Sequence, residues 1–246
     1  MTRCALQAVR QGSPPSTALE LAALNRAWQQ LKPTQRVECA FDHLPANHVL
    51  SSSFGMQAAV MLHLVTQVQP DIPVIFVDTG YHFAETYGFV DQLTDRLRLN
   101  LEIVRADLSP AWQEARFGRR WEQGRAGIDA YNQANKVEPM RSALRRLKAG
   151  SWFSGLRRTQ ASTRAGTEFI ENQWQSLKIH PIADWTDRDI HRYLARHDLP
   201  YHPLREKGYL SIGDWHTTRS IHEVDNEAQL RFLGETRECG LHQGHQ

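Results

Sequence analysis

The chain has 246 residues, 41% of them hydrophobic, which is enough for one sizeable core with a peripheral tail. Its 29 basic and 27 acidic residues give a formal net charge of +2, far from the positive balance typical of a nucleic-acid-binding domain. No apolar run approaches the length of a membrane span, and the N-terminus does not form the apolar region of a secretory signal. We therefore expect a soluble, cytoplasmic α/β protein without nucleic-acid or membrane partners, in which any anion site is local.

The predicted elements alternate between strand and helix. A first helix is expected over residues 19–31, ending before Pro33. Later strands are predicted over 48–50, 73–77, 101–104, 152–155 and 177–182, and helices over 56–65, 83–97 and 186–197. This alternation predicts a doubly wound, mainly parallel sheet with right-handed crossovers.

The loop after the first predicted strand is rich in hydroxyl groups. It contains Ser51, Ser52, Ser53 and Gly55 and leads directly into a helix, where backbone N–H groups and the helix dipole favour an anion. The loop lacks the lysine of a Walker A motif, so it does not indicate a P-loop NTPase. Serine-rich turns are common, and the residue types alone leave a plain turn as the alternative to a phosphate site.

The three cysteines, Cys4, Cys39 and Cys239, are odd in number and far apart, which argues against a disulfide framework. None belongs to a Cys-Cys or Cys-x-x-Cys pair, and the histidines show no H-E-x-x-H spacing. We therefore expect neither a metal site nor an iron–sulfur cluster.

Several motifs, in the same order, closely resemble those of the assimilatory phosphoadenylyl-sulfate (PAPS) reductases. They are Ser51–Gln57, Val77–Tyr87, Asn135–Met140, Gly155–Arg158, Tyr201–Leu204, Gly208–Asp214 and Glu238–His242. The resemblance implies an adenine-nucleotide hydrolase-like fold (PP-loop, Rossmann-like), a homodimer, no bound metal or flavin, and electrons from thioredoxin or glutaredoxin. From the composition along the chain we expect a disordered segment 1–17, a nucleotide-binding reductase domain 18–218 and a mobile C-terminal tail 219–246 that carries Cys239.

The related adenylyl-sulfate (APS) reductases share the fold and the terminal motif but bind an iron–sulfur cluster through a Cys-Cys pair and a later Cys-x-x-Cys. Near Asn135–Met140 and Gly213–Thr218, where we expect those ligands to fall, this sequence has no cysteine. The difference favours the cluster-free branch that uses PAPS, although it does not by itself fix the nucleotide preference.

The predicted nucleophile is Cys239, which would take the sulfo group as S-sulfocysteine. A free thiol with a pKa of about 8.5 is mostly protonated at neutral pH, so nearby positive charge is needed, and Arg237 and His242 are the local candidates. From position alone Cys239 could equally be an unreactive tail cysteine; the five-residue terminal motif favours the catalytic role.

A thiolate that approaches an anionic substrate is repelled by about 4 kcal/mol per charge pair at roughly 4 Å, so cations must line the pocket. The candidates are Lys136, Arg157, Arg158, Arg164, Arg219 and Arg237, each with a solvated surface charge as the alternative. By resemblance we rank three of these residues first. They are Lys136, which we expect to be catalytic, Arg157 and Arg164. We assign adenosine contacts to Asp78, Thr79 and Gly80 at the end of the second strand, where the alternative is a simple turn.

Three other functions remain open at this level: an APS reductase, an adenylating PP-loop relative that uses ATP, and a nucleotide-sensing module without chemistry. The second would have no use for Cys239, and the third would release no sulfite from PAPS.

Overall fold

A computed structural model describes residues 18–231 and residue 241. The predictions for residues 1–17 lie outside the described residues, as do those for most of the segment after residue 231. Within the described part, no helix combines the length and the apolar character needed to cross a membrane.

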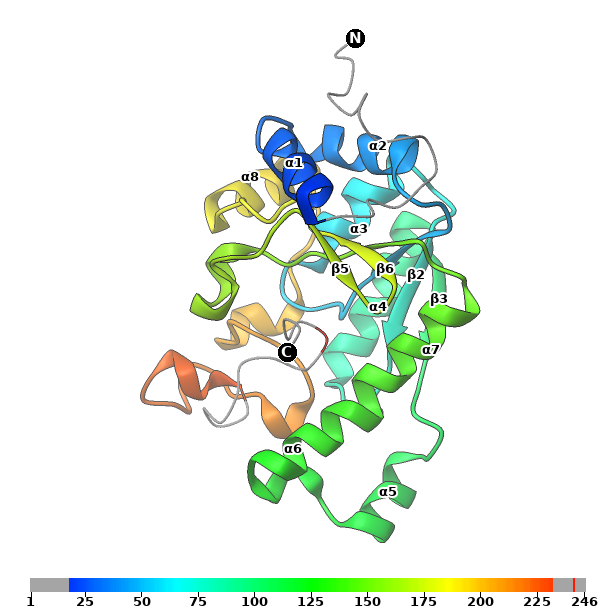
Figure 1. Cartoon of the computed structure of the whole chain (residues 1–246). Coiled ribbons are helices and arrows are strands. Elements are labelled where there is room, and N and C mark those ends of the chain that lie inside the picture. Colours follow the sequence, from blue (N-terminus) through cyan, green and yellow to red (C-terminus); the bar gives the residue numbers. More distant parts are fainter. Residues whose placement is uncertain (1–17, 232–240, 242–246) are drawn as a thin grey trace.

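The centre of the fold is a six-stranded sheet in the order β3-β2-β1-β4-β6-β5 (Figure 1). Its strands are β1 His48–Ser51, β2 Pro73–Val77, β3 Asn100–Val104, β4 Ser151–Phe153, β5 Ile170–Gln173 and β6 Ser176–Ile179. All neighbouring pairs are parallel except β5 with β6. The predicted α/β class with a mainly parallel sheet is confirmed.

The described part of the chain has eight α-helices, of which α5 and α6 lie at one end of the molecule and the other six pack around the sheet (Figure 1). They are α1 Ala18–Trp28, α2 Pro33–His43, α3 Ala58–Thr66, α4 Ala84–Leu97, α5 Pro110–Phe117, α6 Gly124–Asn132, α7 Glu138–Arg146 and α8 Asp187–Arg196. A π-helical turn, Gln133–Val137, joins α6 to α7. Pro139 lacks the N–H that would bond to the carbonyl of Asn135, which explains why the regular ladder is interrupted there.

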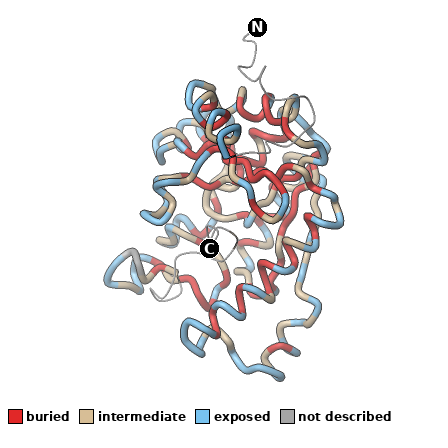
Figure 2. Tube along the Cα trace, viewed as in Figure 1, coloured by how far each residue is buried: buried red, intermediate tan, exposed pale blue. Residues whose placement is uncertain are grey.

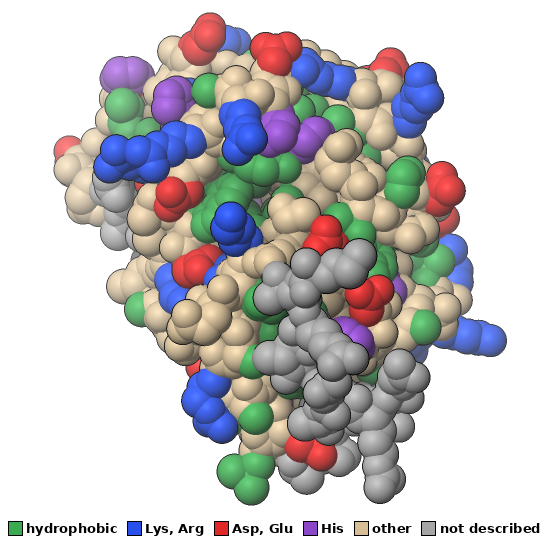
Figure 3. Space-filling view, turned by 90° about the horizontal axis from the view of Figure 1, so that it is seen from above, with side chains coloured by type: hydrophobic (Ala, Val, Ile, Leu, Met, Phe, Trp, Pro, Cys, Tyr) green, Lys and Arg blue, Asp and Glu red, His purple; other side chains and the backbone are tan. Residues whose placement is uncertain are grey.

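The two faces of the sheet bury different amounts of apolar surface. Successive side chains on a strand point to opposite faces. Leu50 and Phe153 accordingly belong to a large cluster with α1, α2, α3, α4 and α8, whereas Val49 and Trp152 belong to a smaller cluster with α7. The buried red stretches of Figure 2 follow the strands and the inner sides of these helices. The surface seen in Figure 3 carries basic and acidic side chains interspersed with one another.

Two elements differ from the sequence predictions. Pro33 does not end helical structure but begins α2 at its first position, where a missing N–H costs nothing. Strand β5 was not predicted; it forms a hairpin with β6 through Trp174 and Gln175, both at positive φ. Such two-residue turns usually carry Asn-Gly or a similar pair, so this turn had no recognisable sequence signal.

Candidate active site

The first loop of the site follows β1 at the carboxyl edge of the sheet. The backbone N–H of Ser52 donates to the carbonyl of Ile75 (3.0 Å), and the Ser52 hydroxyl accepts from the N–H of Phe54 (3.1 Å). Phe54 has φ +47°, an unusual conformation for a bulky residue, and its ring is fully buried with its edge on Phe76. The buried ring anchors the loop, while Ser53 faces solvent and α3 begins five residues later at Ala58.

The second loop follows β2, the neighbouring strand. The carboxylate of Asp78 accepts hydrogen bonds from the Tyr87 hydroxyl (2.7 Å), from Nε of Arg105 (2.7 Å) and from the N–H of Gly80 (2.9 Å). Burial alone raises the pKa of Asp78, but the bonds from Tyr87 and Arg105 outweigh it and lower that pKa below its ordinary value. Gly80 has φ +74°, and a Cβ there would lie 2.5 Å from Cγ of Pro110. The Asp78 side chain therefore stabilises the loop through these hydrogen bonds, and only a glycine fits at position 80.

A buried ion pair links this second loop to two distant segments. Nζ of Lys136, on the π-helical turn, lies 2.6 Å from Oδ2 of Asp214. The Thr79 hydroxyl donates to Oδ1 of Asp214 (2.6 Å), and Nδ1 of His82 is 3.9 Å from the same oxygen. Asp214 is fully buried and Lys136 is 7% exposed.

The charge state of Asp214 follows from these contacts. Burial raises the pKa of this carboxyl, but the adjacent charge of Lys136, with the hydrogen bonds from Lys136 and Thr79, brings it far below the usual range. Asp214 is thus an anion that fixes the Lys136 ammonium beside Thr79. Sequence reasoning selected Lys136 and Thr79 but missed Asp214, whose only signal was its place in the motif Gly208–Asp214.

His216 lies two residues further on, packed among aromatic rings. Its centroid is 3.7 Å from that of Trp121, 4.8 Å from Tyr81 and 5.3 Å from Tyr131. Burial lowers the pKa of His216 to about 4. The ring is therefore neutral at neutral pH and supplies packing rather than positive charge.

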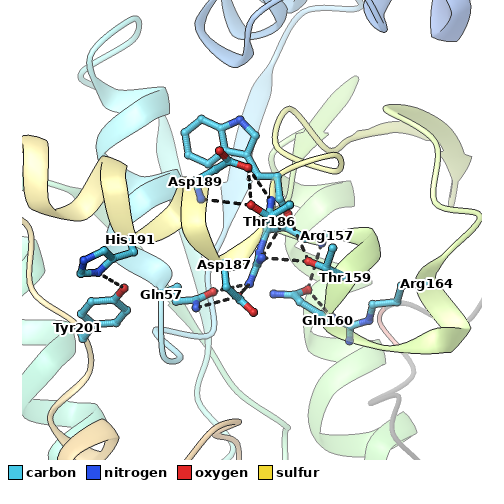
Figure 4. A network of polar contacts seen from close by, with 11 residues as sticks. Gln57, Arg157, Thr159, Gln160, Arg164, Thr186, Asp187, Asp189, His191 and Tyr201 are labelled. Carbon is cyan, nitrogen blue, oxygen red and sulfur yellow. Dashed lines mark hydrogen bonds and ion pairs between the residues drawn. The ribbon is translucent and has the colours of Figure 1, made fainter.

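The third part of the site surrounds Arg157, which follows β4 (Figure 4). Its Nη2 donates to Gln57 (2.6 Å) and to Asp187 (2.8 Å), and its Nη1 donates to Thr159 (3.1 Å) and to the carbonyl of Trp185 (3.2 Å). Gln57 is the N-cap of α3 and Asp187 the first residue of α8. Arg157 is only 3% exposed, so it is a fixed cation that joins the helix behind the first loop to α8.

The remaining predicted arginines are partly buried. Nε of Arg158 donates to the carbonyl of Thr167 (2.7 Å), and Nη1 of Arg164 donates to Gln160 (2.7 Å) beside the Arg157 network. Nη1 of Arg219 donates to the carbonyl of Thr218 (2.9 Å). The structure thus brings Lys136 and Thr79 together, and it places Arg157 close to Gln57 at the start of α3. The substrate contacts assigned to all these residues stay predictions.

The predicted nucleophile Cys239, with Arg237 and His242, lies outside the described residues. Cys39 on α2 is 4% exposed and takes part in a disulfide bond, contrary to the expectation drawn from cysteine spacing. Its sulfur is therefore not a free thiol. Among the described residues, no three His, Cys, Asp or Glu side chains gather where they could share a metal ion.

The chain is similar to known proteins over most of its length. The family model "Phosphoadenosine phosphosulfate reductase domain" matches residues 47–220. A relative named "Phosphoadenosine 5'-phosphosulfate reductase" from Alkalilimnicola ehrlichii is 58% identical over 223 residues, which cover 91% of each chain.

Solved structures agree with these matches. A phosphate complex of PAPS reductase from Candida auris has a TM-score of 0.73 and 28% identity, and the match covers 85% of this chain and all of that one. FMN adenylyltransferase from Candida glabrata, at 14% identity and a TM-score of 0.55 over 83% of this chain and 72% of its own, shares the fold. The chain belongs to the phosphoadenosine phosphosulfate reductase family.

Proposed function

We propose that this protein is an oxidoreductase that reduces PAPS to sulfite and adenosine 3′,5′-bisphosphate in sulfate assimilation. The observation that carries the proposal is the family match over residues 47–220, joined to a buried lysine at the carboxyl edge of the sheet. The 58% identity to a named reductase over 91% of both chains supports the same activity.

The nucleotide is proposed to bind across the first two loops. The loop Ser51–Gly55 and the N-terminus of α3 offer hydroxyl and backbone donors for phosphate oxygens. Thr79 and Gly80 follow the adjacent strand and would contact adenosine. Arg157, held by Gln57 beside the first loop, would add a bidentate cation.

The chemistry proceeds in two displacements. The Cys239 thiolate attacks the sulfur of the sulfo group, the bond from that sulfur to the phosphate oxygen breaks, and adenosine 3′,5′-bisphosphate leaves with the electron pair. Lys136, aimed by Asp214, would neutralise the oxygens that carry charge in this step. The product on the enzyme is S-sulfocysteine.

The second displacement needs two electrons from a dithiol, for which thioredoxin or glutaredoxin in the cytoplasm is the proposed source. One partner thiolate attacks Sγ of Cys239, and sulfite leaves with the electrons of the S–S bond. The second partner thiol then resolves the mixed disulfide, which returns Cys239 as a thiol and leaves the partner oxidised. No bound metal, flavin or iron–sulfur cluster takes part in this scheme, and the active form is proposed to be a homodimer.

The test is single-turnover chemistry with purified protein. Incubated with PAPS and no dithiol, then quenched, the wild-type chain is expected to gain the mass of one SO₃ group on Cys239. Cys239→Ser should bind adenosine 3′,5′-bisphosphate but form neither adduct nor sulfite, whereas the control Lys148→Met, at an exposed lysine before β4, should form both. An adduct-free wild-type enzyme that still releases sulfite would refute the mechanism, and turnover of APS in preference to PAPS would refute the substrate.

A further inference from the structure

Residue 241 lies against the hairpin of β5 and β6, whose strands are labelled in Figure 1. Nζ of Lys178 donates to the carbonyl of Leu241 (2.6 Å), and Nε2 of Gln173 donates to the same oxygen (3.2 Å). The Leu241 side chain packs on the smaller apolar cluster, between the sheet and α7. Two hydrogen-bond donors and an apolar contact thus hold Leu241 against the hairpin.

Lys178 is an unusual residue for its position, because it lies within strand β6 and is only 1% exposed. Its Nζ is 4.3 Å from the centroid of the Trp152 ring, which stacks on Trp174 at 5.6 Å and 16°. A charged group is costly to bury unless it gains strong interactions in return. The carbonyl of Leu241 and the face of Trp152 supply two of them.

Trp152 also connects the binding site of Leu241 to the first loop. Nε1 of Trp152 donates to the hydroxyl of Ser51 at 2.5 Å, and Ser51 is the last residue of β1. A single indole therefore contacts the lysine that binds Leu241 and the first serine of the predicted phosphate loop. In the sequence, Cys239 lies two residues before Leu241, and two residues of chain span at most about 7 Å.

We propose that Lys178 and Gln173 are positioning residues, which assist sulfo transfer to Cys239 by binding the carbonyl of Leu241, two residues further along the sequence. The proposal rests on the proposed function, in which Cys239 is the nucleophile. It gives a buried strand lysine that was not among the predicted site residues a role in the reaction without contact to substrate.

Lys178→Met tests this role, since methionine preserves the apolar stem and removes the donor. The rate of adduct formation on Cys239 at saturating PAPS, followed by intact mass without dithiol, is expected to fall about ten- to hundredfold, the loss typical of a charge-assisted hydrogen bond. The Kd for adenosine 3′,5′-bisphosphate is expected to change by less than about twofold, because neither Lys178 nor Gln173 is among the residues proposed to bind the nucleotide. Lys148→Met, at an exposed lysine before β4, is the matched control and should change neither value.

Gln173→Leu removes the weaker donor and provides a second variant in case Lys178→Met lowers the melting temperature. Its adduct rate is expected to fall about two- to tenfold, as for a neutral hydrogen bond. Hydrogen exchange of the C-terminal peptide should be faster in both variants than in wild type. An unchanged adduct rate in both variants, or a Kd that weakens in parallel with the rate, would overturn the positioning role.

The two proposals fail in different ways. If wild type forms no adduct on Cys239, the proposed mechanism is wrong, and the exchange experiment still decides whether Lys178 and Gln173 bind the chain end. If wild type forms the adduct and the variants match it in rate and exchange, only the anchor is wrong.

Discussion

Two ion pairs of the candidate site have similar geometry but very different access to water. Lys136 and Asp214 lie 2.6 Å apart with side chains 8% and 0% exposed, whereas Arg157 and Asp187 lie 2.8 Å apart with side chains 4% and 78% exposed. In the first pair neither charge can be rehydrated if its partner leaves. In the second, the carboxylate already faces solvent.

This difference separates two kinds of cation in one site. A buried pair is costly to break, because the remaining charge is left in a poorly solvated place. Lys136 is therefore held at one position and is suited to orient a reacting group. An exposed carboxylate gives up its partner at little cost, so Arg157 can exchange Asp187 for a phosphate oxygen while Gln57 and the carbonyl of Trp185 maintain its orientation.

The largest effect is expected from breaking the buried pair. Lys136→Met leaves Asp214 as an uncompensated buried carboxylate, and we expect the free energy of unfolding to fall by about 3–5 kcal/mol. Urea unfolding at neutral pH measures this loss. Sulfite formation from PAPS should also be lost, because the variant lacks the cation that we propose to neutralise the sulfo oxygens.

The double variant Lys136→Met/Asp214→Asn separates stability from chemistry. With both charges removed, most of the lost stability should return, while sulfite formation should stay absent. Recovery of turnover in the double variant would show that Lys136 serves only to neutralise Asp214. Lys148→Met is again the control and should keep both stability and turnover.

A smaller effect is expected from the buried histidines of the same region. Burial lowers the pKa of both His202 and His216 from 6.5 to about 4. Between these values the unfolded chain binds protons that the folded chain does not, so stability falls as the pH decreases from about 6.5 towards 4. For each histidine, the free energy of unfolding should fall by about 2 kcal/mol when the pH is lowered from 7 to 5.

His202→Gln isolates one of these contributions. Nδ1 of His202 accepts a hydrogen bond from the N–H of Leu204. Because a neutral imidazole has only one N–H, Nε2 is then the donor, and it lies 3.1 Å from the Thr86 hydroxyl. Between pH 7 and pH 5, the free energy of unfolding measured in urea should fall by about 2 kcal/mol less in the variant than in wild type. An equal loss in both proteins would contradict the assignment.

Much of the strand and helix order could be predicted from the sequence because each signal is local. The apolar run Pro73–Val77 and the N-cap at Thr186, whose hydroxyl accepts from the N–H of Asp189, need only near neighbours. Strand β5 was missed because its register depends on pairing with β6, and its Trp174-Gln175 turn lacks the usual residues.

The site could be predicted only where a residue type reveals its chemistry. Ser51 and Lys136 carry groups that suit a phosphate or a sulfo oxygen, and the resemblance supplied their context. Asp214 could not be recognised in this way, because its role depends on Thr79, 135 residues away in the sequence, and on the fold that brings Lys136 to it. A site for an anion is expected to contain basic residues, so an acidic residue is not expected there. The ion pair with Lys136 explains why Asp214 is present.

The smallest effect is expected from the exposed member of the second pair. Asp187→Asn should change the free energy of unfolding by less than about 1 kcal/mol, since the carboxylate is already hydrated. Without that competing carboxylate, Arg157 is more available to phosphate, and the Kd for adenosine 3′,5′-bisphosphate should fall by up to about fivefold in calorimetry. Asp198→Asn, which removes an exposed partner of Arg96 elsewhere on the surface, is the matched control and should leave the Kd unchanged. Weaker binding by Asp187→Asn would mean that Asp187 orients Arg157 for the phosphate rather than competing with it, and the two ion pairs would then act alike.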